Sequence, residues 1–245
     1  MTQTKKRYGL STLLLTAITA AAAGAVVTAV VIASLTPATE APVAGPTAGA
    51  TPGATTAAPA PQVPDLARRV QGDPLAIGSV DAPVVMIEYS DYRCPYCSLF
   101  SRDILPTLID TYVADGTLRI EWRDLPIFGE QSEAAAMAGR AAGEQGKFWE
   151  YQHALHAEAP ERGHPDLPRE KLIALASAAG VPDLAAFETA MDNPAHAQAI
   201  GADVREAQSL GITGTPAFLI GGEAMSGMQP MEIFQAAIER QAARP

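Results

Sequence analysis

The pattern of hydrophobic and polar positions divides the chain into three regions. The first contains residues 10–35, which carry no charge and consist of Leu, Ala, Val, Ile, Thr, Ser and Gly. A helix of this length, rising about 1.5 Å per residue, would cross a hydrocarbon core about 30 Å thick. Residues 5–7 are basic and no basic residue follows until Arg68, which predicts a cytoplasmic N-terminus. We expect residues 1–35 to form a retained transmembrane signal-anchor; a cleaved signal peptide is the alternative.

The second region, residues 36–64, has the composition of a linker. It holds seven prolines among mostly Ala, Thr and Gly, and Glu40 is its only charged residue. Such a segment buries too little apolar surface to offset the entropy lost on ordering. Its prolines favour extended geometry, with a reach of up to roughly 90 Å at about 3.1 Å per residue. We therefore predict a disordered Pro/Ala/Thr-rich linker.

The third region, residues 65–245, has the composition of a folded domain. An apolar run at 84–89 predicts a strand buried on both faces, and alternation at 118–122 predicts a second strand. Between these two strands, residues 94–113 predict a helix that Pro106 kinks, because proline cannot donate a backbone hydrogen bond inside a helix.

Helical periodicity dominates the chain after the second predicted strand. Ser132 is the expected N-cap of an Ala-rich helix that ends at Ala142. A short strand at 217–220 and a hairpin turn at 221–222 come near the end of the chain. Further helices are predicted at 148–156, 169–179, 183–191, 196–210 and 231–242. This order of elements predicts an α/β domain with a helical insertion.

Composition and charge argue against several functional classes. The 245 residues carry a net charge of -10, whereas a nucleic-acid binder needs a basic face. The 2 cysteines are too few for a disulfide-stapled scaffold or for a closed four-thiolate zinc site. Only one Cys–Cys bond is possible, so the spacing and context of this pair decide its chemistry.

The two cysteines form the motif Cys94-Pro95-Tyr96-Cys97, directly after a predicted strand and at the start of a predicted helix. The first helical turn has unsatisfied N–H groups and the positive end of the helix dipole, which favour a thiolate. We therefore expect Cys94 to be a nucleophile with a lowered pKa. Cys97 lies one turn later and could close a small disulfide with it, and Pro95 suits the first helical position.

Two other interpretations of the cysteine pair are open. The pair could be an inert structural disulfide, although a loop this short gains little from closure. It could also be half of a zinc site that His153 and His156 complete, three positions apart on one predicted helix. These histidines are more simply explained as surface residues of that helix, so no metal site is expected.

A second feature is Thr215-Pro216, which directly precedes the apolar segment at 217–220. A proline in this position cannot supply an N–H group to the ladder of a central strand. The sequence Gly-Thr-Pro therefore indicates a tight bend into the strand, where a cis X–Pro bond is plausible.

The Cys-Pro-Tyr-Cys and Thr-Pro motifs together resemble the thioredoxin superfamily. The helical block between the second strand and the Thr-Pro motif resembles its DsbA-like branch of bacterial thiol–disulfide oxidoreductases, and the likeness runs from about Arg68 to Arg240. The Pro-Tyr dipeptide departs from the Pro-His of the archetypal DsbA. Three short segments also resemble this branch: Asp91-Tyr92, Arg123-Asp124-Leu125-Pro126 and Gly146-Lys147-Phe148-Trp149-Glu150.

The resemblance implies a role for each candidate site residue. In this superfamily the proline is cis and packs beside the disulfide, and the backbone before it pairs with the substrate chain. Thr215 and Pro216 are therefore expected to bind substrate. Glu88 is expected to be a buried acid beneath the disulfide that passes protons to the second cysteine, and an exposed strand-end Glu is the alternative. Pro95 and Tyr96, between the cysteines, are expected to tune the redox potential.

The resemblance also implies a function and its partners. A membrane-anchored enzyme of this type, with its catalytic domain outside the cytoplasmic membrane, would introduce disulfides into exported cysteine-containing proteins. Cys94 would attack or be attacked in a mixed disulfide and Cys97 would resolve it. The Cys94–Cys97 disulfide would be the redox group, with no other cofactor, and a membrane redox partner would recharge it. The alternatives are an extracytoplasmic reductase, for example in cytochrome c maturation or repair, and a non-enzymatic metal-binding module.

Overall fold

The computed structural model describes residues 65–244. The predicted transmembrane segment at 1–35 and the predicted linker at 36–64 both lie outside the described residues. Within the described part, no helix combines the length and the hydropathy that a membrane span requires.

A five-stranded mixed sheet forms the centre of the domain, with the strand order β1-β3-β2-β4-β5. β2 and β3 are parallel, and the other neighbouring strands are antiparallel. β2 is the middle strand and all of its residues are buried, which explains the continuous apolar run in its sequence. The strands span Ala76–Ile77 (β1), Val84–Ser90 (β2), Leu118–Asp124 (β3), Ala217–Ile220 (β4) and Glu223–Ser226 (β5).

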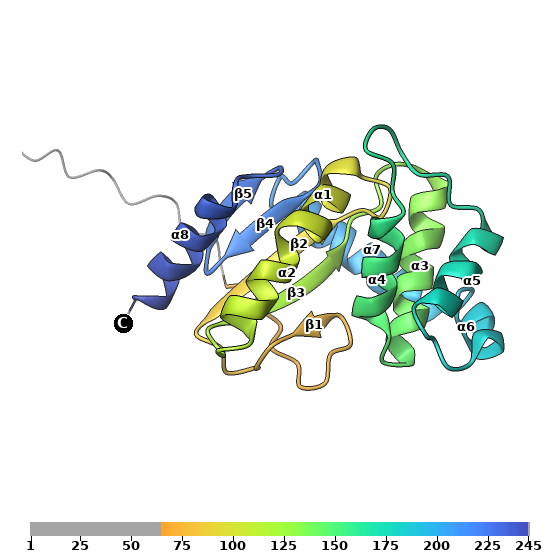
Figure 1. Ribbon diagram of the computed structural model, residues 1–245, viewed down its shortest axis with the longest axis horizontal. Coiled ribbons are helices and arrows are strands. Elements are labelled where there is room, and N and C mark those ends of the chain that lie inside the picture. Colours follow the sequence, from red (N-terminus) through yellow and green to blue (C-terminus); the bar gives the residue numbers. More distant parts are fainter. Residues whose placement is uncertain (1–64, 245) are drawn as a thin grey trace, which may run out of the picture. The chain divides into compact units, whose positions relative to one another are not determined.

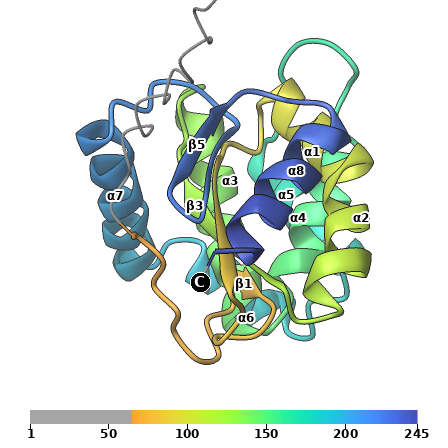
Figure 2. The same ribbon diagram turned by 90° about the vertical axis from the view of Figure 1, so that its left-hand side faces the viewer.

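Helices cover both faces of this sheet and form a separate group beside it (Figure 1). Seen along the sheet edge, α7 lies on one face, and α1, α2 and α8 lie on the other (Figure 2). Helices α3 to α6 form the predicted helical insertion. The helices span Pro95–Asp103 (α1), Leu105–Leu108 (α2), Ile109–Val113 (a π-helix, η1), Glu130–Glu144 (α3), Phe148–Ala157 (α4), Arg169–Ala178 (α5), Leu184–Ala190 (α6), Pro194–Ser209 (α7) and Met231–Ala242 (α8).

The predicted helix details are correct only in part. The kink predicted in the helix at 94–113 is present at Ile104, where α1 ends and α2 begins, but the last part of this segment widens into the π-helix η1. Pro106 has no N–H group to continue the ladder of α1, so the chain ends one helix and starts another. Ser132 is not an N-cap, because Gly129 takes that position with a positive φ of 86° and Ser132 lies inside the first turn of α3.

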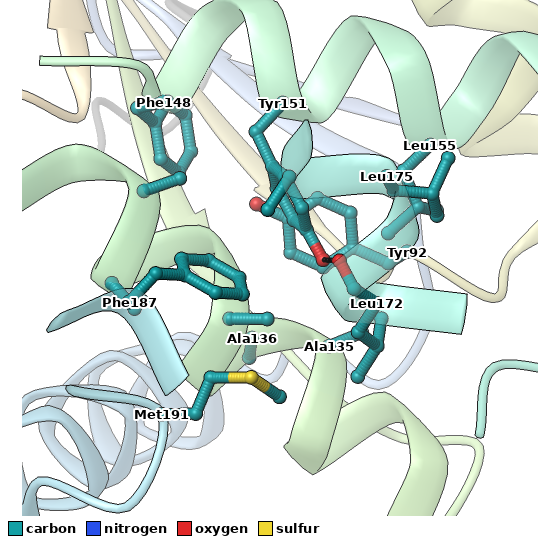
Figure 3. Packing of buried hydrophobic residues seen from close by; sticks show 14 of the residues in the cluster. Tyr92, Ala135, Ala136, Phe148, Tyr151, Leu155, Leu172, Leu175, Phe187 and Met191 are labelled. Atoms are coloured by element: carbon teal, nitrogen blue, oxygen red, sulfur yellow. Dashed lines mark hydrogen bonds between the residues drawn. The ribbon is translucent and has the colours of Figure 1, made fainter. Parts of the chain in front are cut away.

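Three buried clusters hold these layers together. One face of the sheet packs against α1, α2 and α8 through side chains that include Phe100 and Phe234. The other face packs against α7, where Ala207 is fully buried. The third cluster fills the helical insertion, with Tyr151 and Phe187 near its centre and their ring centroids 5.8 Å apart (Figure 3). The first cluster is the one that supports the helix carrying the cysteines.

The polar face of β3 is buried, although its alternating sequence is typical of a half-exposed strand. Glu121 accepts hydrogen bonds from Arg119 and Arg123, both at 2.9 Å, and from the backbone N–H groups of Arg68 and Arg69. Burial by itself raises the pKa of Glu121, but these hydrogen bonds more than offset it and lower the pKa to about 2. Buried ion pairs thus take the place of apolar contacts on this face.

Candidate active site

Cys94 is the N-cap residue of α1 and follows the end of β2. Its backbone is extended, with φ of -75° and ψ of 121°, and its N–H group donates to the carbonyl oxygen of Asp91 at 3.0 Å. Pro95 is the first helical residue, as predicted, and Cys97 lies within the first turn. Both cysteines are buried and are present as free thiols.

The Thr215–Pro216 segment lies directly against Cys94. The bond between Thr215 and Pro216 is cis, which confirms the prediction from the sequence. The thiol of Cys94 donates a hydrogen bond of 3.2 Å to the carbonyl oxygen of Thr215. This contact follows from the sheet, because β4 begins at Ala217 and pairs antiparallel with β2 up to Tyr89, just before the cysteine motif.

The two thiols differ in acidity. The pKa of Cys94 is lowered to about 6, chiefly because the Cys97 thiol donates a hydrogen bond to its sulfur. Burial opposes this shift, whereas the Thr215 side chain and the N–H groups of Tyr96 and Cys97 support it. The pKa of Cys97 is raised well above its usual value, because burial and the neighbouring Cys94 disfavour a second negative charge. Cys94 is therefore the thiolate of the pair.

The two residues between the cysteines face different surroundings. Pro95 is half-buried, and the side chain of Tyr96 is 58% exposed, one of the most exposed large apolar groups among residues 65–244. Tyr96 thus acts on Cys94 through its backbone N–H group, while its ring is open to a partner molecule.

Glu88 is a fully buried carboxyl group in the middle strand. It lies between Trp122 on β3 and Phe218 on β4, its partners in the sheet, and neither oxygen has a hydrogen-bond partner among the described residues. Burial raises the pKa of Glu88 to about 8. The Ser90 side chain opposes this shift, and the charge of Cys94 adds to it. The alternative of an exposed strand-end Glu is therefore wrong, and Glu88 is within electrostatic reach of the thiol pair.

Asp91 organises the segment that leads to Cys94. One carboxyl oxygen accepts from the N–H groups of Ile127, at 2.7 Å, and Phe128, at 3.2 Å, and the other accepts from the N–H group of Arg93 at 2.8 Å. The loop after β3 is thereby fastened to the loop after β2. The sequence pointed to Asp91 only as part of the DsbA-like segment and assigned it no contact.

Sequence reasoning also missed the position of His156. The prediction of a surface histidine is wrong, because the side chain of His156 is fully buried and its Nδ1 lies 2.9 Å from the hydroxyl of Ser98 on α1. His153 is exposed. Since the two histidines do not share an environment, the interpretation of a zinc site built on both is not supported. Helical periodicity could show that one face of α4 is buried, but not what that face contacts.

The comparison with protein families assigns the fold. A family model described as "Thioredoxin" matches residues 70–240. The chain belongs to this family. The region matched contains the cysteine motif, the Thr215–Pro216 bend and the whole helical insertion.

Relatives of two kinds share this region. The chain is 33% identical over 165 residues to the Na(+)/H(+) antiporter NhaA 3 of Salinispora tropica, a match that covers 66% of this chain but only 24% of the antiporter. It is 22% identical over 174 residues to disulfide bond formation protein D of Bacillus subtilis, a match that covers 70% of this chain and 78% of the relative. The chain thus spans about a quarter of the antiporters and most of the disulfide bond formation protein.

Solved structures confirm the DsbA-type thioredoxin-like fold. BdbD from Bacillus subtilis superposes with a TM-score of 0.64 at 22% identity, covering 70% of this chain and 93% of that one. A thioredoxin-like oxidoreductase from Silicibacter pomeroyi superposes with a TM-score of 0.61 at 28% identity, covering 71% of this chain and 98% of that one. Wolbachia pipientis alpha-DsbA1 superposes with a TM-score of 0.61 at 23% identity, covering 69% of this chain and 90% of that one. The predicted mixed α/β architecture with a helical insertion is therefore correct.

Proposed function

We propose that this chain is a thiol–disulfide oxidoreductase that works through Cys94 and Cys97 and introduces disulfides into exported proteins. One observation carries the proposal: the Cys94 sulfur sits at the N-terminus of α1 and 3.2 Å from the Thr215 carbonyl oxygen, beside the cis bond to Pro216. A likeness to a protein named for disulfide bond formation, and to DsbA-type structures, supports it.

The proposed reaction starts from the oxidised pair. A thiolate of the client protein attacks the Cys94 sulfur, the Cys94–Cys97 bond breaks, and Cys97 leaves and takes up a proton. A second client thiolate then attacks the client sulfur of the mixed disulfide, and Cys94 leaves as a thiolate. The client loses two electrons and two protons and gains a disulfide. The pair gains the two electrons and ends as a Cys97 thiol and a Cys94 thiolate, while the second proton passes to solvent. A membrane-bound thiol oxidant then returns the pair to the disulfide.

The acidities of the site fit this direction. A stabilised Cys94 thiolate favours the reduced form of the pair, which makes the disulfide a stronger oxidant. Glu88, with its pKa raised to about 8 by burial, is protonated at neutral pH and can supply the proton that the departing Cys97 requires. No metal or further cofactor takes part in the proposed reaction.

The client would bind beside Thr215 and Pro216. A hollow of about 300 Å³ adjoins this bend and is lined by residues 211–214 and by β4 and β5. An extended client segment can pair with the backbone at Thr215, as peptides do when they add to a sheet edge. The exposed ring of Tyr96 would form part of the same client surface.

We further propose that residues 1–35 anchor the protein in the cytoplasmic membrane with the catalytic domain outside. The uncharged segment at 10–35 and the basic residues at 5–7 support this orientation. Membrane fractions should contain the full chain, and protease added to the outer face should release a fragment cut within 36–64. A soluble mature chain that starts after residue 35 would contradict the anchor.

Two measurements test the enzymatic proposal. Equilibration with glutathione should give a reduction potential well above the value of about -270 mV that is typical of thioredoxin, whereas a value near or below it would indicate a reductase. Cys97→Ala should accumulate mixed disulfides with exported proteins on non-reducing gels, because the resolving thiol is missing, and Cys94→Ala should not. If the wild type oxidises clients but Cys97→Ala traps none, the two-cysteine mechanism is wrong.

A further inference from the structure

A buried polar contact joins the helix that carries the cysteines to the helical insertion. Ser98 and Ser101 on α1 face Gln152 and His156 on α4, and all four side chains are buried. Gln152 Nε2 donates to the Ser101 hydroxyl at 3.0 Å, and His156 Nδ1 lies 2.9 Å from the Ser98 hydroxyl. We call these four residues the polar seam. Apolar side chains usually fill such a helix–helix contact, so the burial of four polar side chains here calls for an explanation.

One end of the seam reaches the reactive cysteine. The Ser98 hydroxyl donates a hydrogen bond of 3.2 Å to the carbonyl oxygen of Cys94. A hydroxyl has a single proton, so while Ser98 donates to Cys94 it accepts at His156, and the imidazole tautomer with its proton on Nδ1 completes the chain. Burial lowers the pKa of His156 to about 3, so the ring is neutral and carries one proton. The chain of donors runs from His156 through Ser98 to Cys94.

His156 is itself held firmly in place. Its ring stacks on the ring of Tyr92, with centroids 5.5 Å apart and an angle of 20° between the planes. Its backbone carbonyl oxygen accepts from Nη1 of Arg102, one helical turn after Ser98, at 2.7 Å. These contacts fix the position of the imidazole in the helical insertion, where it packs against α1.

We propose that His156 is a positioning residue for the reactive thiol, which holds the backbone of Cys94 in its N-cap conformation through the hydroxyl of Ser98. This inference rests on the proposed function. Besides the Cys97 thiol, the backbone N–H groups of Tyr96 and Cys97 stabilise the thiolate, and they reach the sulfur only while Cys94 stays extended at the helix start. Because donors in a chain polarise one another, the imidazole N–H strengthens the hydrogen bond from Ser98 to Cys94.

The other end of the seam provides a matched control. Ser101 is buried on the same helix and bonds to the same partner helix, but its hydroxyl contacts Gln152 and not Cys94. Ser98→Ala and Ser101→Ala therefore remove the same group from the same interface. His156→Phe keeps a ring against Tyr92 without the donor, and His156→Asn restores an N–H near the position of Nδ1.

The test measures the pKa of Cys94 from thiolate absorbance near 240 nm, the equilibrium constant for reduction by glutathione, and unfolding by urea. Ser98→Ala and His156→Phe should raise the pKa of Cys94 and lower the equilibrium constant by about 2- to 10-fold, as expected for one neutral hydrogen bond. His156→Asn should recover part of the change. Ser101→Ala should lose stability while leaving both constants at the wild-type values.

Several results would overturn this role for His156. An unchanged pKa of Cys94 in folded Ser98→Ala contradicts this role, even if His156→Phe does not fold. A shift of the Cys94 pKa in Ser101→Ala as large as that in Ser98→Ala would mean that the polar seam is only a structural contact. The double variant Ser98→Ala/His156→Phe should shift the constants no further than either single variant, because both act on one chain of donors. Failure of the proposed function would look different, since the reduction potential of the wild type itself would then lie near or below that of thioredoxin.

Discussion

The sulfur of Cys94 donates a hydrogen bond of 3.2 Å to the carbonyl oxygen of Thr215, across a sequence separation of 121 residues. A thiol can make this bond, but a thiolate or a disulfide sulfur has no proton to donate. In the proposed reaction, the Thr215 carbonyl is therefore free to accept from a client backbone while the pair is oxidised. It becomes occupied only when Cys94 is reduced and protonated.

The acidity of Cys94 gives the first prediction. In the reduced protein, iodoacetamide should alkylate Cys94 with a half-maximal rate near pH 6, because the lowered pKa leaves the sulfur as a thiolate above that value. Cys97 should stay unlabelled, since its pKa is raised well above the usual value and it remains a thiol. Peptide mass spectrometry after timed labelling assigns each site. Equal labelling, or faster labelling of Cys97, would reverse the assignment of the nucleophile.

Local sequence signals predicted the parts of this site that depend on neighbouring residues. A proline after the first cysteine indicated a helix start, and Cys94 is indeed the N-cap of α1. The apolar run of β2 and the proline before β4 indicated which segments form the sheet, and both strands were found where expected. These features depend on backbone geometry that a few adjacent residues determine.

Contacts between distant segments could not be predicted in this way. Ser98 and His156 are 58 positions apart, and the pattern of α4 does not identify the helix that it packs against. The polar face of β3 is buried although its sequence alternates, because Glu206 on α7 and the segment around Arg68 bond to it. Pairing of charges made that burial possible, and such pairing is visible only once the tertiary fold brings the partners together.

The buried ion pairs give the second prediction. Asp203 accepts hydrogen bonds from Arg68 and Arg140, both at 2.6 Å, and from the N–H group of Asp124 at 3.1 Å, and its side chain is fully buried. Asp203→Ala leaves these donors without their partner and should lower the free energy of unfolding by about 3–5 kcal/mol. Urea unfolding at neutral pH measures the loss.

Asp192 offers a control with the same chemistry on the surface. It accepts two hydrogen bonds from Arg169, at 3.0 and 2.9 Å, but its side chain is 70% exposed. Asp192→Ala should lower the free energy of unfolding by no more than about 1 kcal/mol. Losses of similar size in the two variants would show that burial does not determine the contribution of these pairs.

A close approach between α3 and the end of β2 gives the third prediction. A Cβ atom on Gly139 would overlap the hydroxyl oxygen of Tyr92, whose ring is buried and packs against Trp122 at 5.1 Å between centroids. The tyrosine cannot move away without displacing its neighbours. Gly139→Ala should therefore lower the free energy of unfolding by about 1–3 kcal/mol or more.

Gly143, one turn later on α3, provides the opposite case. A Cβ atom there would meet Leu75 and Pro74 at 3.4 Å, an ordinary contact distance. Gly143→Ala should raise the free energy of unfolding by up to about 1 kcal/mol, because alanine loses less conformational entropy in a helix. Urea unfolding of the two variants should give changes of opposite sign, and a gain for Gly139→Ala would disprove the close contact.

The buried carboxyl of Glu88 gives the last prediction. Its pKa rises from 4.5 to about 8 on folding, because burial disfavours the charged form. Between these two pH values the unfolded chain releases a proton that the native protein retains. The native state therefore binds more protons, and the free energy of unfolding falls as the pH rises from about 4.5 to 8. The fall attributable to this group is on the order of a few kcal/mol.

Glu88→Gln keeps the size of the side chain and removes its titration. Wild type and variant should be unfolded with urea at several pH values between 4 and 9 in the presence of a reductant. The other titrating groups are common to both proteins, so the difference between their free energies of unfolding reports on Glu88. As the pH rises from about 4.5 to 8, the free energy of unfolding of the wild type should fall steadily relative to that of Glu88→Gln. Above about pH 8 the difference should stay constant. A difference that stays constant with pH would mean that Glu88 is ionised in the native protein and cannot supply a proton to Cys97.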